Sequence, residues 1–235
     1  MVRKLMFDFY SEYDFAVTDS KEGLEILVGW RRNTFSQVIW TQKRDFQNDI
    51  LDLRPGGLLS VNFEGELYNL LFLHTDSGAT SREYKIRKEM FSKVWKLKTA
   101  LEKANEFSRA NMITLGDLNT MGNGSSISGR SEIRRLNRAA KENGMRMLKK
   151  DQEVTWHQWS NGPKRNRRKL KVSDLASAVR SNLDHVIVSE ELKIETIDQD
   201  CNEIKVYGWN QLNGIKLINF LWNISDHSAL FGKLS

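Results

Sequence analysis

The hydrophobic pattern changes period about a third of the way along the chain, and this change constrains the fold more than any other feature. Upstream of it, short apolar stretches separated by turn residues are typical of β-strands, at 13–17, 24–30, 35–40 and twice more between 54 and 78. Residues 82–107 instead carry apolar side chains at spacings of three or four, which predicts an amphipathic helix with a charged outer face. The chain therefore combines β structure with a long helix.

The remainder of the chain continues this alternation. A strand at 112–115 follows the helix, and residues 131–150 predict a second helix that breaks near Gly144. Three further strands are expected, at 153–159, at 183–189 and after His227. Because the sequence has no internal repeat and no linker, we interpret residues 1–235 as a single mixed α/β domain.

Composition excludes several classes of protein. No apolar run approaches the roughly 20 residues of a membrane-spanning helix. The single cysteine, Cys201, excludes an internal disulfide and a cysteine-rich zinc site. The opening residues are too short and too polar a stretch for a secretory signal, so a cytoplasmic location is expected, although a start beyond this chain could carry a signal. The protein is expected to be a monomer.

Polar side chains gather directly after apolar strand segments. Asp117 and Asn119 follow the strand at 112–115 and, being two residues apart, would project on the same face of an extended chain. Similar groups follow or begin other strands, namely His74 with Asp76, Asn182 with Asp184 and His185, and Asp226 with His227. Each group alone has an ordinary explanation, as a core histidine or as a turn-forming acid or amide. Together they indicate a site at strand ends.

A basic run follows at residues 164–171, with six Lys or Arg among eight residues. Its turn residues predict a loop, and two interpretations stay open: a solvated surface, or contact with a phosphate backbone. The candidate nucleic-acid-binding side chains are Lys164, Arg165, Arg167, Arg168 and Lys169. The net charge of +6 favours polyanionic partners only mildly.

Three motifs in this order resemble those of the endonuclease/exonuclease/phosphatase superfamily, whose members include deoxyribonuclease I-like enzymes. They are the GDLN segment ending at Asn119, the SNLDHVIVS segment around Asp184 and the SDH segment ending at His227. The resemblance runs from about Tyr13 to the C-terminus. It implies an α/β fold of two facing mixed β-sheets flanked by helices, a four-layer sandwich, with the active site at one edge.

The resemblance also implies chemistry: a metal-dependent phosphodiester hydrolase, most simply one acting on nucleic acid. His227 would contact the scissile phosphate or act as general base, and Asp184 would orient its imidazole. Asp117 would position or deprotonate the attacking water. Asn119 and His74 would contact the phosphate or the water from other sides. Asp226 would help to hold Mg²⁺ or Mn²⁺, hard cations that favour oxygen ligands.

One expected part has no counterpart in the sequence. Members of the superfamily open with a strand ending in Asn, a helix, and a strand ending in Gln-Glu, whose glutamate is the principal metal ligand. Only about a dozen residues precede Tyr13, too few for such a unit, which needs roughly 10–12 residues for its crossover alone. We therefore expect an N-terminally incomplete domain. Two alternatives stay open: a weak or inactive relative that binds nucleic acid, and a phosphomonoesterase of the inositol-phosphate type.

Overall fold

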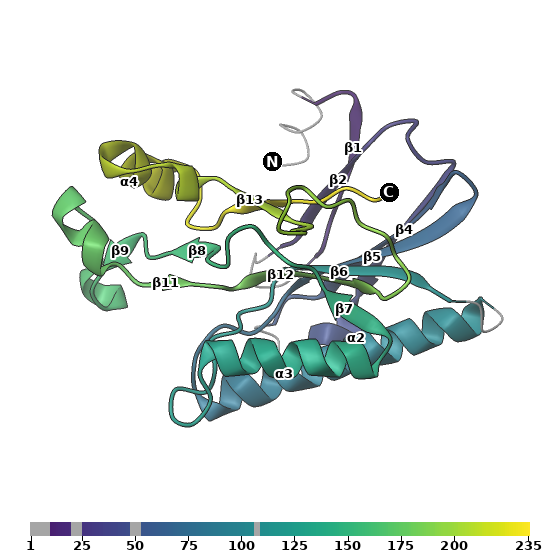
Figure 1. Cartoon of the computed structure of the whole chain (residues 1–235), viewed down its shortest axis with the longest axis horizontal. Helices are drawn as coiled ribbons and strands as arrows, with labels where there is room; N and C mark the ends of the chain where they lie inside the picture. Colours follow the sequence, from purple (N-terminus) through teal and green to yellow (C-terminus); the bar gives the residue numbers. More distant parts are fainter. Residues whose placement is uncertain (1–9, 20–24, 48–52, 106–108) are drawn as a thin grey trace.

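The computed structural model describes residues 10–19, 25–47, 53–105 and 109–235 (Figure 1). Its strands are β1 (Tyr13–Val17), β2 (Leu27–Arg31), β3 (Gln37–Lys43), β4 (Gly56–Phe63), β5 (Glu66–His74), β6 (Asn111–Asp117), β7 (Met145–Met147), β8 (Trp156–His157), β9 (Ser160–Asn161), β10 (Arg168–Lys169), β11 (Arg180–Ser181), β12 (Asp184–Ser189), β13 (Lys205–Tyr207) and β14 (Ala229–Phe231). Its α-helices are α2 (Ser81–Ala104), α3 (Gly129–Glu142) and α4 (Gly214–Asn223). Short 3₁₀ helices are η1 (Arg44–Gln47), η2 (Lys164–Asn166), η3 (Val172–Ser177) and η4 (Trp209–Gln211).

A six-stranded mixed sheet forms the centre of the molecule, in the order β3-β4-β5-β6-β12-β7. The pair β5–β6 is parallel and is connected through α2, whereas the other pairs are antiparallel. A parallel pair requires such a crossover connection, which is why the long helix stands between β5 and β6 in the chain. Every residue of β12 is buried, as expected for a strand covered on both faces.

Helices α2 and α3 cover one face of this sheet (Figure 1). Helix α2 begins at a capping box, in which Thr80 accepts from the Arg82 amide and the Glu83 carboxylate accepts from the Thr80 amide. Its apolar stripe, including Met90 and Val94, packs on the sheet in the main core. The predicted helix is confirmed as far as Ala104, and residues 106 and 107 of the predicted range lie outside the described residues.

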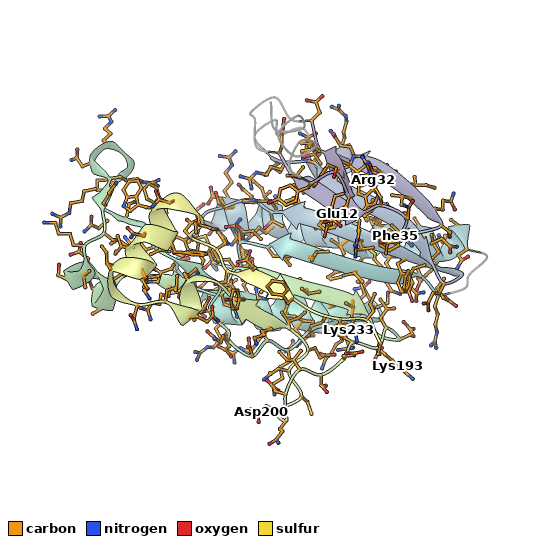
Figure 2. The ribbon with its side chains drawn as sticks, turned by 90° about the horizontal axis from the view of Figure 1, so that it is seen from above. Glu12, Arg32, Phe35, Lys193, Asp200 and Lys233 are labelled. Atoms are coloured by element: carbon orange, nitrogen blue, oxygen red, sulfur yellow. The ribbon has the colours of Figure 1, made fainter. Side chains whose placement is uncertain are left out.

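The opposite face of the sheet carries a second β layer that is divided into pieces. The pairs β1–β2 and β13–β14 lie over this face in Figure 1, and each is a separate two-stranded sheet. Figure 2, turned to a view from above, places Glu12 and Arg32 in the β1–β2 part and Asp200 projecting away from the body. The expected α/β fold with two β layers and flanking helices is confirmed, with its second layer divided.

An extension projects from the central sheet on the side where β12 begins and where β5 and β6 end (Figure 1). It contains β8, β9, β10, β11 and α4, and it has its own small core of Leu170, Trp209, Leu217, Ile218 and Leu221, with Trp159 and Trp222 packed against it. Because β11 leads into β12 after two residues, the extension is joined directly to the central sheet.

Three details differ from the sequence expectations. The second helix ends at Glu142. The break expected near Gly144 is confirmed, because this glycine, with a φ of +64°, turns the chain into β7, but no helix continues from there to residue 150. The strand expected at 153–159 is reduced to the two residues of β8. The basic run is not a plain loop, because it contains η2 and β10. Within the described ranges, no helix has both the length and the apolar character that crossing a membrane requires.

Candidate active site

Three neighbouring strands place an ionisable side chain at the same level of the central sheet. In the register of the parallel pair β5–β6, His74 lies opposite Asp117, and in the antiparallel pair β6–β12, Asp117 lies opposite Asp184. Side chains at one level of adjacent strands stand on the same face. The sequence expectation that these strand ends meet is therefore confirmed by the register.

His227 reaches the same place from the second layer. Its Nδ1 lies 2.9 Å from Oδ2 of Asp184, and its Nε2 lies 3.7 Å from Oδ2 of Asp117. The Nε2 of His74 lies 3.4 Å from that same Asp117 oxygen. Asp117 thus stands between two imidazoles, and one of them is held by a second carboxylate.

The segment that carries His227 is fixed by β8. Trp156 forms a β-bridge with His227, and the amide of His157 donates to the carbonyl of Asp226. Thr155, which is fully buried, accepts hydrogen bonds from the amides of Leu183 and Asp184 through its Oγ1. Thr155 therefore ties the start of β12 to the strand that positions His227.

The nearby charges of Asp117, Asp184 and His227 change the pKa values within the cluster. Burial and, after it, the nearby charge of Asp184 raise the pKa of Asp117 to about 6, while His227 and an amide hydrogen bond from Asn119 oppose the change. Burial alone would lower the pKa of His227, but its hydrogen bond to Asp184 and the charges of Asp184 and Asp117 outweigh burial and raise it. The cluster therefore favours a protonated His227 beside an Asp117 that titrates close to neutrality.

The raised pKa of Asp117 predicts a pH-dependent cost in stability. A carboxyl with a pKa of about 6 in the folded protein binds protons more tightly there than in the unfolded chain, where its pKa is 3.8, so stability falls as pH rises between these values. The free energy of unfolding of Asp117→Asn, taken relative to wild type, should be about 2–3 kcal/mol larger at pH 8 than at pH 4. This follows because one pKa unit is worth about 1.4 kcal/mol. Urea unfolding at both pH values measures this difference.

Asp200→Asn is the matched control, since Asp200 is exposed and projects into solvent (Figure 2). Its stability relative to wild type should be the same at both pH values within about 0.5 kcal/mol. If the effect of Asp117→Asn on the free energy of unfolding is equal at pH 4 and pH 8, then the surroundings do not destabilise the ionised form of Asp117.

Asn119 lies in the cluster but has a structural contact. Its side-chain amide donates to the carbonyl of Thr75 at 2.9 Å, and its own backbone amide donates to Oδ1 of Asp117 at 3.0 Å. The residue is 4% exposed and has a φ of +44°, a left-handed conformation that asparagine tolerates better than most residues. It holds the ends of β5 and β6 together beneath the reactive groups.

Asp226 lies beside His227, yet the described residues do not form a metal site around it. Its Oδ2 accepts a hydrogen bond from the Trp156 indole at 3.0 Å. In the part of the chain that the structure describes, no group of three His, Cys, Asp or Glu side chains could hold a metal ion. Mg²⁺ and Mn²⁺ favour several oxygen ligands, so this donor set alone does not fit either ion.

The basic run lies in the extension and not among the acids and histidines. Of the five candidates, Arg165, Arg167, Arg168 and Lys169 are exposed, and the side chain of Lys164 lies outside the described part. Arg167 stands 5.2 Å from the Trp159 ring centroid, and Lys169 stands 4.2 Å from that of Trp222. These stacking contacts hold the two cations on an aromatic base without pairing them to an acid.

Sequence reasoning missed several contacts that build the site. Thr155, Trp156 and Lys150 orient it through contacts with residues distant in sequence, and Lys150 donates to the carbonyl of Asp184 at 2.6 Å. Burial, partly offset by the charge of Asp184, lowers the pKa of Lys150 to about 8. No local motif marks these residues, since their partners lie 28 to 70 positions away.

Comparison with solved structures identifies the fold. TDP2 of D. rerio, solved with a single strand DNA product, matches with a TM-score of 0.59 at 15% identity, over 99% of this chain and 80% of that one. An endonuclease/exonuclease/phosphatase family protein from Leptotrichia buccalis matches with a TM-score of 0.53 at 16% identity, over 100% of this chain and 76% of that one. This is the endonuclease/exonuclease/phosphatase fold.

Other structures with the endonuclease/exonuclease/phosphatase fold differ in the activity that they are named for. A mannosyl-6-phosphatase of Bacteroides thetaiotaomicron matches with a TM-score of 0.53 at 14% identity, over 99% of this chain and 80% of that one. No protein-family model and no curated protein sequence matches this chain. The likeness therefore identifies the fold, and activity has to be argued from the site.

Proposed function

We propose that this protein is a phosphodiester hydrolase that acts on nucleic acid. The observation that carries the proposal is the series Asp184–His227–Asp117–His74, in which each neighbouring pair of side chains lies within 3.7 Å. An acid that fixes a histidine, beside a second acid and a second histidine, supplies both charge and proton-transfer groups to one phosphate.

Each group has a role that follows from its surroundings. Because Asp184 holds Nδ1 of His227, its Nε2 is left to donate to a phosphate oxygen when the ring is protonated. Asp117, with a pKa of about 6, is close to the value that suits a base near neutral pH, and it would accept a proton from the attacking water. His74, partly exposed on the other side of Asp117, would contact the same phosphate.

Mg²⁺ or Mn²⁺ is proposed as the cofactor on the strength of the resemblance, and it would supply charge to the phosphate when bound. Asp226 is the described carboxylate that would contribute to holding it, and the remaining ligands would have to come from outside the described set. The roles proposed for Asp117, His227 and His74 do not depend on the ion.

Nucleic acid is the favoured substrate because the extension carries its basic run beyond the edge of the sheet that holds the site (Figure 1). Phosphates bound by these side chains would release counterions, which makes affinity depend on salt. Replacing Arg165, Arg167, Arg168 and Lys169 with glutamine should reduce the log–log salt slope of oligonucleotide binding by about 0.7–0.9 for each phosphate that is no longer neutralised. Fluorescence anisotropy over a range of salt concentrations measures the slope.

Glutamine keeps two methylenes of each side chain, and the small core of the extension contains neither Arg167 nor Lys169, so this core is preserved. The matched control replaces Arg134, Arg138 and Lys141 on the exposed surface of α3, which faces away from the sheet. An unchanged slope in the extension variants would assign the basic run to solvent contacts alone.

A substrate panel tests the proposed activity against the alternatives. With protein in excess over substrate, single-stranded DNA, RNA and a sugar monophosphate are incubated with Mn²⁺, and cleavage and phosphate release are compared. We expect slow chain cleavage, detectable because the protein is in excess, and we expect this cleavage to disappear in His227→Ala. Phosphate release from the monoester alone would favour a phosphomonoesterase, and binding with no hydrolysis of any kind would favour a nucleic-acid-binding relative.

A further inference from the structure

Arg54 stands at the same edge of the sheet as the candidate active site. It precedes the first residue of β4 by two positions, and the antiparallel register of β4 and β5 pairs Gly57 with Phe72. The start of β4 therefore lies beside the end of β5, where His74 is located. None of the motifs in the sequence includes this arginine, which lies just before β4 outside any helix or strand and carries no recognisable spacing.

The charges of Arg54 and Asp117 act on each other. Burial lowers the pKa of Arg54 and the Asp117 carboxylate raises it, while the arginine in turn lowers the pKa of Asp117. The Asp117 carboxylate contacts His74, His227 and the amide of Asn119. It forms no ion pair with Arg54, so the guanidinium of Arg54 acts on this carboxylate through its charge, without direct contact.

The guanidinium of Arg54 also has no other partner in the described ranges. No carboxylate, carbonyl or side-chain acceptor there forms an ion pair or hydrogen bond with it. A partly buried guanidinium normally has its donors satisfied, since each donor withdrawn from water without a partner costs free energy. The contrast with Arg87, whose guanidinium binds a carboxylate and three carbonyls, is direct.

We propose that Arg54 binds a non-bridging oxygen of the substrate phosphate, from the β4 side of the cluster that contains His74, Asp117 and His227. This inference rests on the proposed function and names a further residue of the same site. A guanidinium is permanently charged and its planar fork fits two phosphate oxygens, which an imidazole cannot do. Arg54, His74 and His227 then surround the position of one phosphate, and affinity for that phosphate comes from the protein's own cations.

The competing explanation is that Arg54 only offsets the negative charge of Asp117 and Asp184 and contacts no substrate. The two explanations differ in anion binding. An arginine that binds phosphate contributes directly to affinity for a free phosphate ion, and a lysine in its place recovers part of that affinity. An arginine that only offsets charge acts through its net charge alone, so Arg54→Lys, which keeps that charge, should bind phosphate as tightly as wild type does.

Titration of the full chain with inorganic phosphate in the presence of EDTA, followed by ³¹P NMR or calorimetry, separates these explanations. We expect Arg54→Met to weaken phosphate binding about 10–100-fold, the range for removing a hydrogen bond to a charged group. Arg54→Lys should bind more tightly than Arg54→Met. The matched control is Arg138→Met on the exposed surface of α3, which should bind as wild type does.

Circular dichroism and urea unfolding show whether each variant is folded, and Arg54→Lys keeps the test usable if Arg54→Met is not. Phosphate binding by Arg54→Met that equals wild type, while His227→Ala loses binding, would overturn the role of Arg54 and leave the proposed function in place. Failure of the wild-type chain to bind phosphate at all would overturn both.

Discussion

Replacing Arg87 with methionine is expected to destabilise the protein by about 3–5 kcal/mol, the cost of leaving one partner of a buried ion pair without the other. Arg87 is 0% exposed, and its Nε and Nη2 lie 2.8 Å and 2.9 Å from the two carboxylate oxygens of Glu132. It also donates to the carbonyls of Asp76, Gly78 and Gly122. Methionine fills the space of the inner part of the arginine side chain and removes every one of these hydrogen bonds.

The same hydrogen bonds hold the loops on either side of the site. Asp76 and Gly78 follow His74, and Gly122 follows Asn119, so Arg87 joins the loop after β5 to the loop after β6. Urea unfolding measures the loss of stability. We also expect broadened NMR signals of the His74 imidazole in Arg87→Met, because both loops lose their common anchor.

Arg31→Met is the matched control, since Arg31 pairs with Glu12 at 3.3 Å with side chains 67% and 61% exposed. An exposed pair of this kind contributes at most about 1 kcal/mol. The double variant Arg87→Met with Glu132→Leu should cost less than the sum of the single changes, because no charge is then left buried without a partner. A loss below about 1 kcal/mol for Arg87→Met would contradict the role of this pair.

The sequence predicts those parts of the protein that depend on local pattern. The period of α2, the apolar strand of β6 and the polar residues after it are all visible locally, and the register then brings His74, Asp117 and Asp184 together. The burial of Arg87 is not visible, because a charged residue in an amphipathic helix normally faces water and its partner Glu132 is 45 positions away.

Other features depend on the assembled fold. Thr155 and Trp156 matter through contacts with Asp184 and Asp226, and no spacing in the chain announces either contact. The division of the second β layer has the same origin, because strand pairing between distant segments such as β13 and β14 is decided by which edges meet. The role of Asp226 as a metal ligand stays a prediction.

The second large effect concerns catalysis: the 235-residue chain alone is expected to cleave DNA little above background in Mg²⁺. The described residues include no group of three ligands for a metal, and Oδ2 of Asp226 already accepts from Trp156. Mg²⁺ relies on few protein carboxylates, so the lack of such a ligand group among the described residues predicts weak binding of the ion. Without the ion, the site loses several kcal/mol of charge stabilisation in the transition state.

Calorimetric titration with Mg²⁺ measures the first part of this expectation and should show binding no tighter than millimolar. A plasmid-nicking assay measures the second. Robust, EDTA-sensitive and His227-dependent cleavage by this chain would contradict both, and it would require another acid, with Asp76 the nearest in sequence to His74, to act as a ligand.

The central claim is that His74 and Asp117 at the ends of β5 and β6, Asp184 at the start of β12, and His227 before β14 act on a phosphodiester. The most direct measurement is DNA cleavage by a longer chain, in which a segment with the Asn-ended strand, the helix and the Gln-Glu strand implied by the family resemblance precedes Tyr13. We predict that this chain cleaves DNA in an EDTA-sensitive manner and that His227→Ala abolishes the cleavage. A folded longer chain that fails to cleave, or that cleaves equally well without His227, would contradict the claim.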